Sequence, residues 1–470
     1  MPLILGTNSI KDTGFNVANS LRFNDGSSDY LNKTLGSDGN RKKWTWSGWV
    51  KRSGFVASQM IFGSKSGNIS ASLNFRDDQL RFLDYDDGTF GSQLKTNRLF
   101  RDVSAWYHIV VAYDTTQGTE SNRIKFYVNG VQETSFATST YPSVNFNGYI
   151  NESDYTHYVG SEDGSQNFFD GYMAEVCFIN DQQLDATSFG EFDEDTGIWK
   201  PIDVSGLSFG NNGFYLDFES SGSLGSDVSG NGNNFTVNNL TAIDQSTDTC
   251  TNNSATWQPL DGHIAHVVFS EGNLKSDFGS TATKKSFVRS TIGVASGKWY
   301  FEAKVIQNAN FFSTGISDRP SPSDSTELGS GAYDYAYVND GGTNSKLNNG
   351  TYSSYGDSFT TNDIIGVAVD LDNLKIYFSK NGTFQNSGNP TNGTNPAFTI
   401  TAPSLTDHGF YFFCVGDMTQ ANNVTWSANF GSPSYSESGG NSDGNGYGNY
   451  AGSVPSGYYA LNTKNLAEYG

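Results

Sequence analysis

The stretch RIKFYVNGV, at residues 123–131, decides the fold class of this chain. Its residues Ile124, Phe126 and Val128 alternate with polar or amphipathic side chains, which is the period of a half-buried β-strand. The dipeptide Asn-Gly follows, and it tolerates the positive φ that a two-residue hairpin turn requires. The stretch therefore predicts a β-hairpin with one apolar face.

A second stretch, NLKIYFSKNGT at residues 373–383, repeats this pattern far downstream. It predicts a strand with Leu374, Ile376 and Phe378 on its apolar face, closed by a second Asn-Gly turn. An isolated hairpin is only marginally stable in water, so each of the two must pack on further strands. Two hairpins so far apart predict two β-domains, each with its own core.

The composition favours sheets over helices. Of the 470 residues 53 are glycine, which favours turns, and 14% are aromatic, which favours strands. Residues 181–195 are the segment most similar to an amphipathic helix, and they predict only one or two helical turns. A chain of this length is also too long to fold around a single hydrophobic core. We therefore expect an all-β protein of two β-sandwich, or jelly-roll, domains joined by a Gly/Ser/Asn-rich connector.

The formal net charge of −21 makes an extended nucleic-acid interface unfavourable, because phosphate would be repelled. The opening MPLILGTNSIKDTG has no basic leader, and no apolar run reaches the length of a membrane span. We therefore expect no nucleic-acid partner, no secretion signal and no membrane insertion. The odd number of cysteines, with Cys177 and Cys414 inside apolar stretches, predicts buried thiols without a disulfide framework.

Five short pieces of the first half carry a family pattern. They are FNDG, WSGWV, WYHIVV, IKFYVNG and FDGYMAEV, at residues 23–26, 46–50, 106–111, 124–130 and 169–176. In this order they resemble the laminin-G-like, or concanavalin A-like, jelly roll. The resemblance implies a β-sandwich that binds carbohydrate or protein, in some members with calcium.

The residues that would hold calcium depart from the family pattern. An acidic residue common in the family is Ala174 here, although Glu175 is kept. Calcium takes six to eight oxygen ligands, and the candidate donors are Asp25, Asp29 and Asp170. Aspartates in turns are more often plain turn-formers. We therefore expect no cofactor, and a calcium site at these three residues stays as the alternative.

The same fold includes glucanases, so catalysis has to be considered. A retaining glycosidase places two carboxyl groups about 5–5.5 Å apart, which a strand with the pattern E-x-D-x-x-E would supply. The closest stretch, EFDEDTG from Glu191, has its third acid misplaced and is typical of a turn. We therefore expect no catalytic residues and a protein that is not an enzyme.

A polar segment follows the first domain. After a short strand, residues 213–253 are almost entirely Gly, Ser, Asn, Asp and Thr, which predicts a surface linker. Leu224, Phe235 and Leu240 are available to anchor it to a neighbour. The run GFYLDF…LGSDVSGNGNNFTVNNL resembles a stretch that follows laminin-G-like domains in virion proteins of marine tailed bacteriophages.

The second half resembles a SPRY domain, another β-sandwich. The matching pieces are SGKWYFEAKV, GI, DIIGVAVD and IYFSKNG, at residues 296–305, 315–316, 363–370 and 376–382. The resemblance implies a binding module whose long loops form a recognition face. Trp299 and Tyr300 are expected in its core.

One loop region of this second domain is the candidate binding site. Tyr333, Tyr335 and Tyr337 alternate, so on a strand they would share one face. Ordinary packing between sheets is one interpretation. The other is a stacking platform for a sugar or a partner, with Asp334 accepting hydrogen bonds from hydroxyl groups.

The chain ends in a Gly/Ser/Asn-rich tail whose last part, VPSGYYALNTKNL, resembles the C-terminus of phage virion proteins. Its apolar residues Val454, Tyr459 and Leu461 predict that it docks on another surface. The expected domains are therefore a concanavalin A-like sandwich with an N-terminal arm (1–205), a connector (206–254), a SPRY-like sandwich (255–432) and the tail (433–470).

These resemblances predict a non-enzymatic structural protein on the virion surface of a tailed phage, made in the cytoplasm of the host bacterium. It would be a tail fibre, a spike or a head (capsid) decoration that binds host-surface carbohydrate or other virion proteins for host attachment. We expect a homo-oligomer, with a trimer favoured for a fibre or spike. A carbohydrate-active enzyme and an intracellular SPRY adaptor stay as alternatives.

Overall fold

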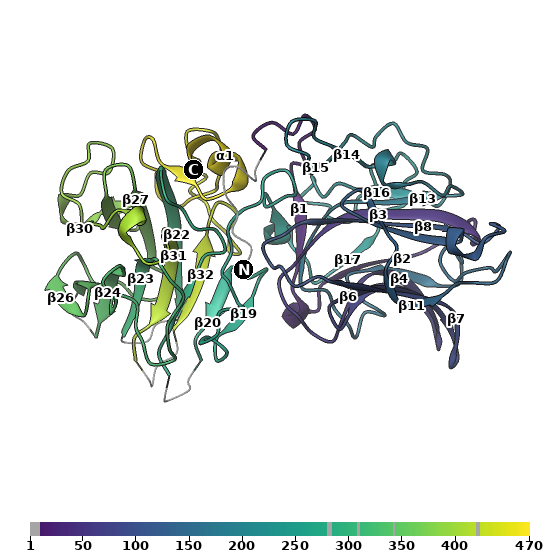
Figure 1. Cartoon of the computed structure of the whole chain (residues 1–470), viewed down its shortest axis with the longest axis horizontal. Coiled ribbons are helices and arrows are strands. Elements are labelled where there is room, and N and C mark those ends of the chain that lie inside the picture. Colours follow the sequence, from purple (N-terminus) through teal and green to yellow (C-terminus); the bar gives the residue numbers. More distant parts are fainter. Residues whose placement is uncertain (1–9, 280–283, 308–310, 342–343, 420–423) are drawn as a thin grey trace. The chain divides into compact units, whose positions relative to one another are not determined.

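The computed structural model describes residues 10–279, 284–307, 311–341, 344–419 and 424–470 (Figure 1). The chain divides into two compact units. We call residues 13–251 the N-terminal sandwich, and residues 252–470 together with 10–12 the C-terminal sandwich. In both, the sheets pair their strands antiparallel except for β22 with β33, and helices are few and short, which confirms the all-β prediction.

The N-terminal sandwich has two eight-stranded sheets. Sheet 1 contains β1 (Ser20–Phe23), β3 (Lys43–Arg52), β8 (Tyr107–Asp114), β9 (Ile124–Val128), β10 (Val131–Glu133), β13 (Gly171–Asn180), β16 (Phe214–Leu216) and β18 (Gln245–Ser246). Sheet 2 contains β2 (Tyr30–Thr34), β4 (Ser58–Ser66), β5 (Ile69–Arg76), β6 (Gln79–Asp86), β7 (Thr89–Leu99), β11 (Phe136–Thr140), β12 (Thr156–Val159) and β17 (Thr236–Asn238). One edge of sheet 1 is β10 and one edge of sheet 2 is β11.

The space between these sheets is an aromatic core. Trp44 on β3 stacks on Tyr113 on β8, with ring centroids 4.8 Å apart and planes 7° from parallel. Both rings are buried, and burial of each large apolar side chain contributes about 1.5–3 kcal/mol. The same core contains the inward residues of the first predicted hairpin.

The first hairpin forms as the sequence predicts. Ile124, Phe126 and Val128 are buried on β9, which pairs with β8 on one side and β10 on the other. Asn129 and Gly130 have φ of 48° and 80°, so the turn uses the left-handed conformations that this dipeptide tolerates.

A third layer covers the outer face of sheet 1. It comes from the segment after β13, which includes the hairpin of β14 (Gly190–Phe192) and β15 (Trp199–Pro201). Phe189, Trp199 and Phe209 of this segment pack on the outward side chains of β3, β8 and β13. Sheet 1 is therefore covered on both faces. This explains why its strands have long runs of apolar residues.

The glycine-rich segment 206–254 lies within the N-terminal sandwich up to residue 251, although the sequence predicts a surface linker there. Its strands β16, β17 and β18 extend both sheets of that sandwich. Leu224, Phe235 and Leu240 are buried in the core between the sheets. These few apolar residues hold the segment in place, which its polar average composition conceals.

The C-terminal sandwich also has two sheets. Sheet 3 contains β19 (Val268–Ser270), β20 (Lys275–Asp277), β22 (Lys298–Gln307), β27 (Ile364–Asp370), β28 (Lys375–Lys380), β29 (Thr383–Phe384), β30 (Phe398–Thr399), β32 (Thr425–Asn429) and β33 (Tyr459–Ala460). Sheet 4 contains β21 (Phe287–Arg289), β23 (Phe311–Ser317), β24 (Tyr335–Asp340), β25 (Asn344–Asn348), β26 (Thr351–Ser354) and β31 (Phe412–Asp417).

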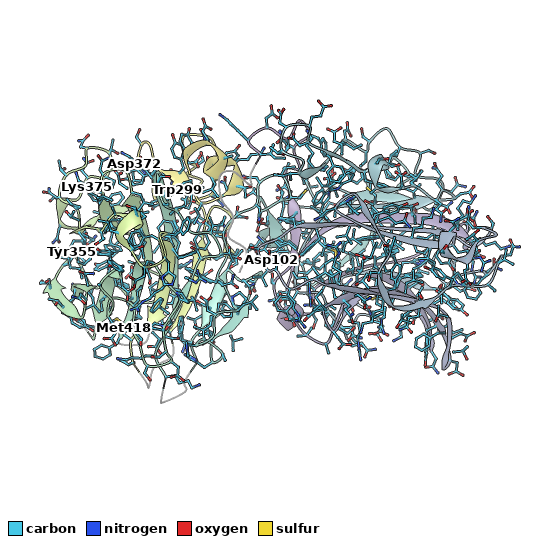
Figure 2. All side chains as sticks on the ribbon, in the orientation of Figure 1. Asp102, Trp299, Tyr355, Asp372, Lys375 and Met418 are labelled. Carbon is cyan, nitrogen blue, oxygen red and sulfur yellow. The ribbon has the colours of Figure 1, made fainter. Side chains whose placement is uncertain are left out.

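The second hairpin belongs to this sandwich. Ile376 and Phe378 on β28 are buried between the sheets as predicted. The same core contains Trp299 and Tyr355, which Figure 2 labels in this sandwich. Leu374 differs from the prediction, because it lies before the strand in the β27–β28 turn with a φ of 58°. Its side chain still packs on the core, but only partly buried.

The C-terminal segment docks on the chain's own C-terminal sandwich. Its strand β33 pairs in parallel with β22, and Leu461 and Leu466 enter the core between sheets 3 and 4. Tyr450 and Tyr458 cover Tyr300 and Tyr377 on the outer face of sheet 3. The docking surface that the sequence predicts for this segment is therefore part of the same chain.

A buried carboxylate ties this segment to sheet 3. The carboxylate of Glu302 on β22 accepts hydrogen bonds from the backbone N–H groups of Ala451 and Gly452, at 2.9 and 2.8 Å. Tyr300 Oη donates to it as well, at 3.0 Å. A buried carboxylate without such donors would be strongly destabilising.

Helical structure is confined to short pieces. The described residues contain one α-helix, α1 (Thr463–Tyr469), and the 3₁₀-helices η2 (Asp25–Ser27), η3 (Glu120–Asn122), η4 (Ala186–Ser188), η5 (Ala242–Asp244), η6 (Gln385–Ser387) and η7 (Pro403–Leu405). Within the described ranges, no helix has the length and apolar character needed to span a bilayer.

Candidate functional site

The tyrosines predicted as a stacking platform lie inside the C-terminal sandwich. Tyr335 and Tyr337 are 4% and 0% exposed on β24, and Tyr333 is partly buried against the same core. Tyr335 Oη accepts a hydrogen bond from the backbone N–H of Thr401 at 2.9 Å. The three rings do share one face, but it is the inward face. The packing interpretation therefore applies, and the prediction of an exposed platform is not supported.

Asp334 is also buried. Its carboxylate accepts hydrogen bonds from Ser317 Oγ at 2.8 Å and from the backbone N–H of Gly331 at 2.7 Å. Burial raises the pKa of Asp334, while these hydrogen bonds act in the opposite direction. The carboxylate thus holds a loop in place and is not available to a ligand.

The structure describes all three candidate calcium ligands. Asp29 accepts hydrogen bonds from the backbone N–H of Asn24 and from Ser27 Oγ. Asp25 is exposed in η2, and Asp170 is half-buried next to β13. Across the residues that the structure describes, no three His, Cys, Asp or Glu side chains form a group that could hold a metal ion.

A serine–histidine pair lies under the third layer of the N-terminal sandwich and resembles a catalytic dyad. Ser47 Oγ is 2.9 Å from His108 Nε2, and the indole Nε1 of Trp199 is 3.1 Å from His108 Nδ1. An indole N–H can only donate, so Nδ1 is the acceptor nitrogen of a neutral imidazole and Nε2 carries the hydrogen. Burial lowers the pKa of His108 to about 3, which keeps the ring neutral.

This tautomer excludes the chemistry that the pair suggests. A general base must accept the serine proton at Nε2, whereas here Nε2–H donates to Ser47. The cavity beside the pair has a volume of only about 10 Å³, which is about the space of one water molecule. The pair therefore has a structural role.

Glu175 lines the same small cavity. It occupies a β-bulge in β13 with a φ of 51°, and Tyr215 Oη donates a hydrogen bond to its carboxylate. Burial raises the pKa of Glu175 to about 7. A carboxyl group with this pKa could serve as a general acid, but no substrate could enter a cavity of this size.

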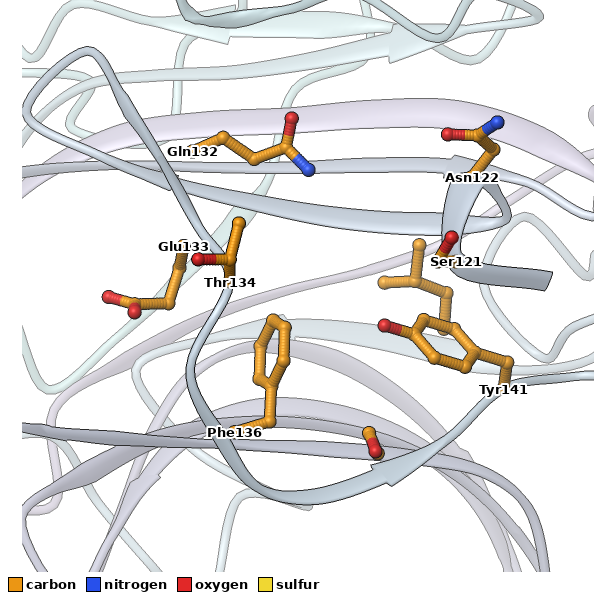
Figure 3. Close-up of a pocket in the computed structure, with 9 residues that line it drawn as sticks. Ser121, Asn122, Gln132, Glu133, Thr134, Phe136 and Tyr141 are labelled. Carbon is orange, nitrogen blue, oxygen red and sulfur yellow. The ribbon is translucent and has the colours of Figure 1, made fainter. Parts of the chain in front are cut away.

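An open groove of about 370 Å³ lies at one edge of the N-terminal sandwich, and we call it the edge groove (Figure 3). It lies beside β10 and β11, which are edge strands of the two sheets. Its lining consists of Ser121, Asn122, Ile124, Gln132, Glu133, Thr134, Phe136, Ser139 and Tyr141. The volume falls within the range of small-molecule sites.

The topology creates this groove. The chain leaves sheet 1 after Glu133 and enters sheet 2 at Phe136, so only two residues cross from one sheet edge to the other. Glu133 fixes the crossing, because it accepts hydrogen bonds from Arg98 Nε at 2.8 Å and from the backbone N–H of Ser135 at 3.4 Å. On the opposite side, η3 supplies Ser121 and Asn122.

The floor of the groove is apolar. Ile124 is almost fully buried, and the half-buried ring of Phe136 makes an edge-to-face contact with Phe126 at 5.8 Å. Figure 3 shows the Phe136 ring standing within the groove, with the phenol of Tyr141 directed toward it. Burial and the nearby Glu120 carboxylate raise the pKa of Tyr141, so its hydroxyl stays protonated.

The walls carry neutral polar groups. Six side chains have a hydroxyl or amide that forms no hydrogen bond with any described residue: Ser121, Asn122, Gln132, Thr134, Ser139 and Tyr141. The amides of Asn122 and Gln132 extend into the groove from opposite sides (Figure 3). An aromatic floor below convergent hydroxyl and amide groups is the arrangement of a ligand site.

The sequence alone did not identify these residues. In the linear sequence, Ser121, Thr134 and Ser139 look like ordinary residues of turns or edge strands. Their convergence depends on the crossing between the two sheets, which no local pattern reveals. A pointer does exist in hindsight, since the aromatic residues Phe136 and Tyr141 flank a run of small polar residues directly after the hairpin.

Two family models match the chain. Residues 25–186 match the model of the concanavalin A-like lectin/glucanases superfamily, and residues 298–405 match that of the SPRY domain. The chain contains a concanavalin A-like domain followed by a SPRY domain. The edge groove belongs to the concanavalin A-like domain, and the buried tyrosines belong to the SPRY domain.

Individual relatives cover parts of the chain. Ran-binding protein 9 of Danio rerio is 33% identical over 132 residues, 27% of this chain and 22% of that protein. The ATP-dependent RNA helicase DDX1 of Xenopus laevis is 37% identical over 94 residues, 20% of this chain and 12% of that protein. The chain thus spans less than a quarter of the length of either relative.

Two solved structures are similar. The SPRY domain of human HERC1 has 20% sequence identity, covers 37% of this chain and 96% of that chain, and gives a TM-score of 0.28. A Bacteroides ovatus protein described as a candidate carbohydrate-binding protein has 17% identity, covers 48% of this chain and 59% of that chain, and gives a TM-score of 0.32.

Proposed function

We propose that this protein is a non-enzymatic binding protein on the surface of a tailed-bacteriophage particle. It would serve as a tail fibre, a spike or a head decoration, and would bind host-surface glycan or neighbouring virion subunits. The observation that carries the binding role is the edge groove, an open site with an apolar floor and neutral polar groups that bond no described residue. The placement on a phage particle rests on the resemblance of residues 213–253 and of the C-terminal segment to virion proteins.

The arrangement of the buried polar residues supports a role without catalysis. The Ser47–His108 pair has the tautomer of a structural hydrogen bond, and Glu175 faces a cavity of about one water molecule. In the edge groove, the carboxylate of Glu133 is engaged by Arg98, and the lining holds no second carboxylate. A glycosidase requires two carboxyl groups across the scissile bond.

Attachment to a surface by such a groove would depend on repetition. A single shallow polar site binds weakly, because it buries little apolar area and its hydroxyl and amide groups are solvated when free. Many copies on one particle raise the effective concentration of each further contact. We therefore expect the protein to be a homo-oligomer on the particle, with a trimer favoured for a fibre or spike.

Mass spectrometry of purified phage particles, with immunogold labelling of the intact particles, tests this proposal. The proposal expects the protein among the particle components and the label on the outside of the head or tail. Absence from purified particles, together with its presence in uninfected cells, would contradict the virion role.

A second candidate is an intracellular adaptor that binds a protein partner. The identity to Ran-binding protein 9 favours it, because the name of that relative states that it binds Ran. The experiment on particles separates the two candidates, since an adaptor would remain in the cytoplasmic fraction of the cell that makes it.

A further inference from the structure

We propose that the edge groove takes one uncharged sugar residue, whose hydroxyls bond the groove's amides and hydroxyls and whose C–H face contacts the rings of Phe136 and Tyr141. This inference rests on the proposed function and defines the class of glycan that the protein would recognise. It also places recognition in the N-terminal sandwich, at the open edge beside β10 and β11.

The first argument is the match between the groove's polar groups and hydroxyls. A sugar hydroxyl both donates and accepts, and so do the hydroxyls of Ser121, Thr134, Ser139 and Tyr141. The amides of Asn122 and Gln132 add two donors and one acceptor each. None of these groups is used by a described neighbour, so a ligand would not have to break an internal hydrogen bond.

The second argument is charge. The lining contains no Lys, Arg or His, so it offers no cation of its own to a carboxylate or sulfate on a ligand. The one charged side chain of the lining, Glu133, has its carboxylate 2.8 Å from Arg98 Nε. That cation is already paired with Glu133, and an anionic sugar would carry the same sign as the chain's net charge of −21. A cationic sugar would have to compete with Arg98 for the same carboxylate.

The third argument is the shape of the floor. Phe136 and Tyr141 present ring surfaces in the groove, and aromatic faces suit the C–H face of a sugar ring (Figure 3). The alternative occupant is an extended peptide added to the edge of β10. Such a peptide would bond mainly backbone groups, whereas the unpartnered groups here are side-chain hydroxyls and amides.

Isothermal titration calorimetry on the full chain tests the inference. The uncharged probes are glucose, galactose, mannose and N-acetylglucosamine, and the charged probes are glucuronate, N-acetylneuraminate and glucosamine. At least one uncharged sugar is expected to bind with one site per chain, and the charged probes at least about tenfold more weakly. The double variant Asn122→Ala/Gln132→Ala is expected to weaken binding about tenfold or more, since it removes two neutral hydrogen-bonding groups.

The matched control is Asn147→Ala, an exposed amide outside the lining, which is expected to leave binding unchanged. Circular dichroism checks that all variants fold. We expect them to fold, because the side chains of Asn122 and Gln132 form no hydrogen bond with any described residue. Failure of all uncharged sugars to bind, equal binding of a charged probe, or binding that survives the double variant would overturn the inference. If the protein is found on particles in spite of such a result, the proposed virion role stands and only this inference fails.

Discussion

Replacement of Tyr335 by alanine shows whether this ring is a core residue or part of an exposed ligand platform. The ring is 4% exposed on β24, at the centre of sheet 4. It makes edge-to-face contacts with Phe398 at 5.4 Å and Tyr411 at 6.1 Å, and its hydroxyl accepts the Thr401 N–H. An exposed platform residue would have none of these constraints.

The expected cost follows from these contacts. Truncation of a buried aromatic ring removes its transfer free energy and leaves a cavity, which together destabilise by about 3–5 kcal/mol. Tyr335→Phe keeps the ring and removes only the hydroxyl, so it should cost about 1–2 kcal/mol, from the lost hydrogen bond to Thr401. We therefore expect Tyr335→Ala to be the least stable protein, Tyr335→Phe to be intermediate and the wild type to be the most stable.

Urea unfolding of the full chain provides the assay, with amide hydrogen exchange assigning the affected transition to the C-terminal sandwich. The control is Tyr352→Ala on β26 of the same sheet, because that ring is 47% exposed and should cost no more than about 0.5 kcal/mol. If Tyr335→Ala changed stability as little as Tyr352→Ala, the ring would not be core and the placement of this strand would be refuted.

Three further predictions address other parts of the molecule. Because the folded-state pKa of Glu175 is raised from 4.5 to about 7, its contribution to stability is fully present below pH 4.5 and lost as the pH rises through 7. Glu175→Gln should therefore be more stable than wild type by about 3 kcal/mol at pH 8 and about equal at pH 4, which thermal unfolding across this range measures; a constant difference would contradict the assignment. Tyr450→Ala should destabilise the C-terminal sandwich by about 3–5 kcal/mol in urea unfolding, because the ring is buried on sheet 3, and a shift below 1 kcal/mol would show that the C-terminal segment is detached. Calcium or a chelator should leave the thermal midpoint unchanged, because the three candidate aspartates form no metal-holding group in the described chain, and a midpoint that rises with calcium would refute this.

Local patterns predicted the strands well. The alternation around Phe126 and Phe378 placed both hairpins, because a strand with one buried face must repeat every two residues. The turn of the second hairpin shows the limit, since Leu374 continues the alternation in sequence but lies in a turn with positive φ. Periodicity fixes the inward face and does not fix where a strand begins.

Composition was a poorer guide to the segment 206–254. Its glycine and serine content is that of a linker, yet Phe235 and Leu240 are buried in the core of the N-terminal sandwich. A few apolar residues at the right positions are enough to hold a polar segment on a sheet, because each buried side chain contributes about 1.5–3 kcal/mol. An average over a segment does not show this.

For the candidate sites too, the sequence predicted local geometry but not features that depend on the tertiary structure. Alternation correctly gave Tyr335 and Tyr337 a common face, but burial depends on the neighbouring strands and could not be obtained from one strand. The edge groove combines residues from η3, β9, β10 and β11, so its existence depends on how two sheet edges meet. Such a site becomes visible only when the tertiary structure is known.

Competition for host-cell adsorption tests the central claim most directly. Host cells are incubated with the purified protein, and the rate at which phage particles then adsorb is measured. The account predicts that the wild-type chain slows adsorption in proportion to its concentration, and that Asn122→Ala/Gln132→Ala does so much less than Asn147→Ala. Adsorption that none of the three proteins slows, or that all three slow equally, would contradict a host-glycan role for the edge groove.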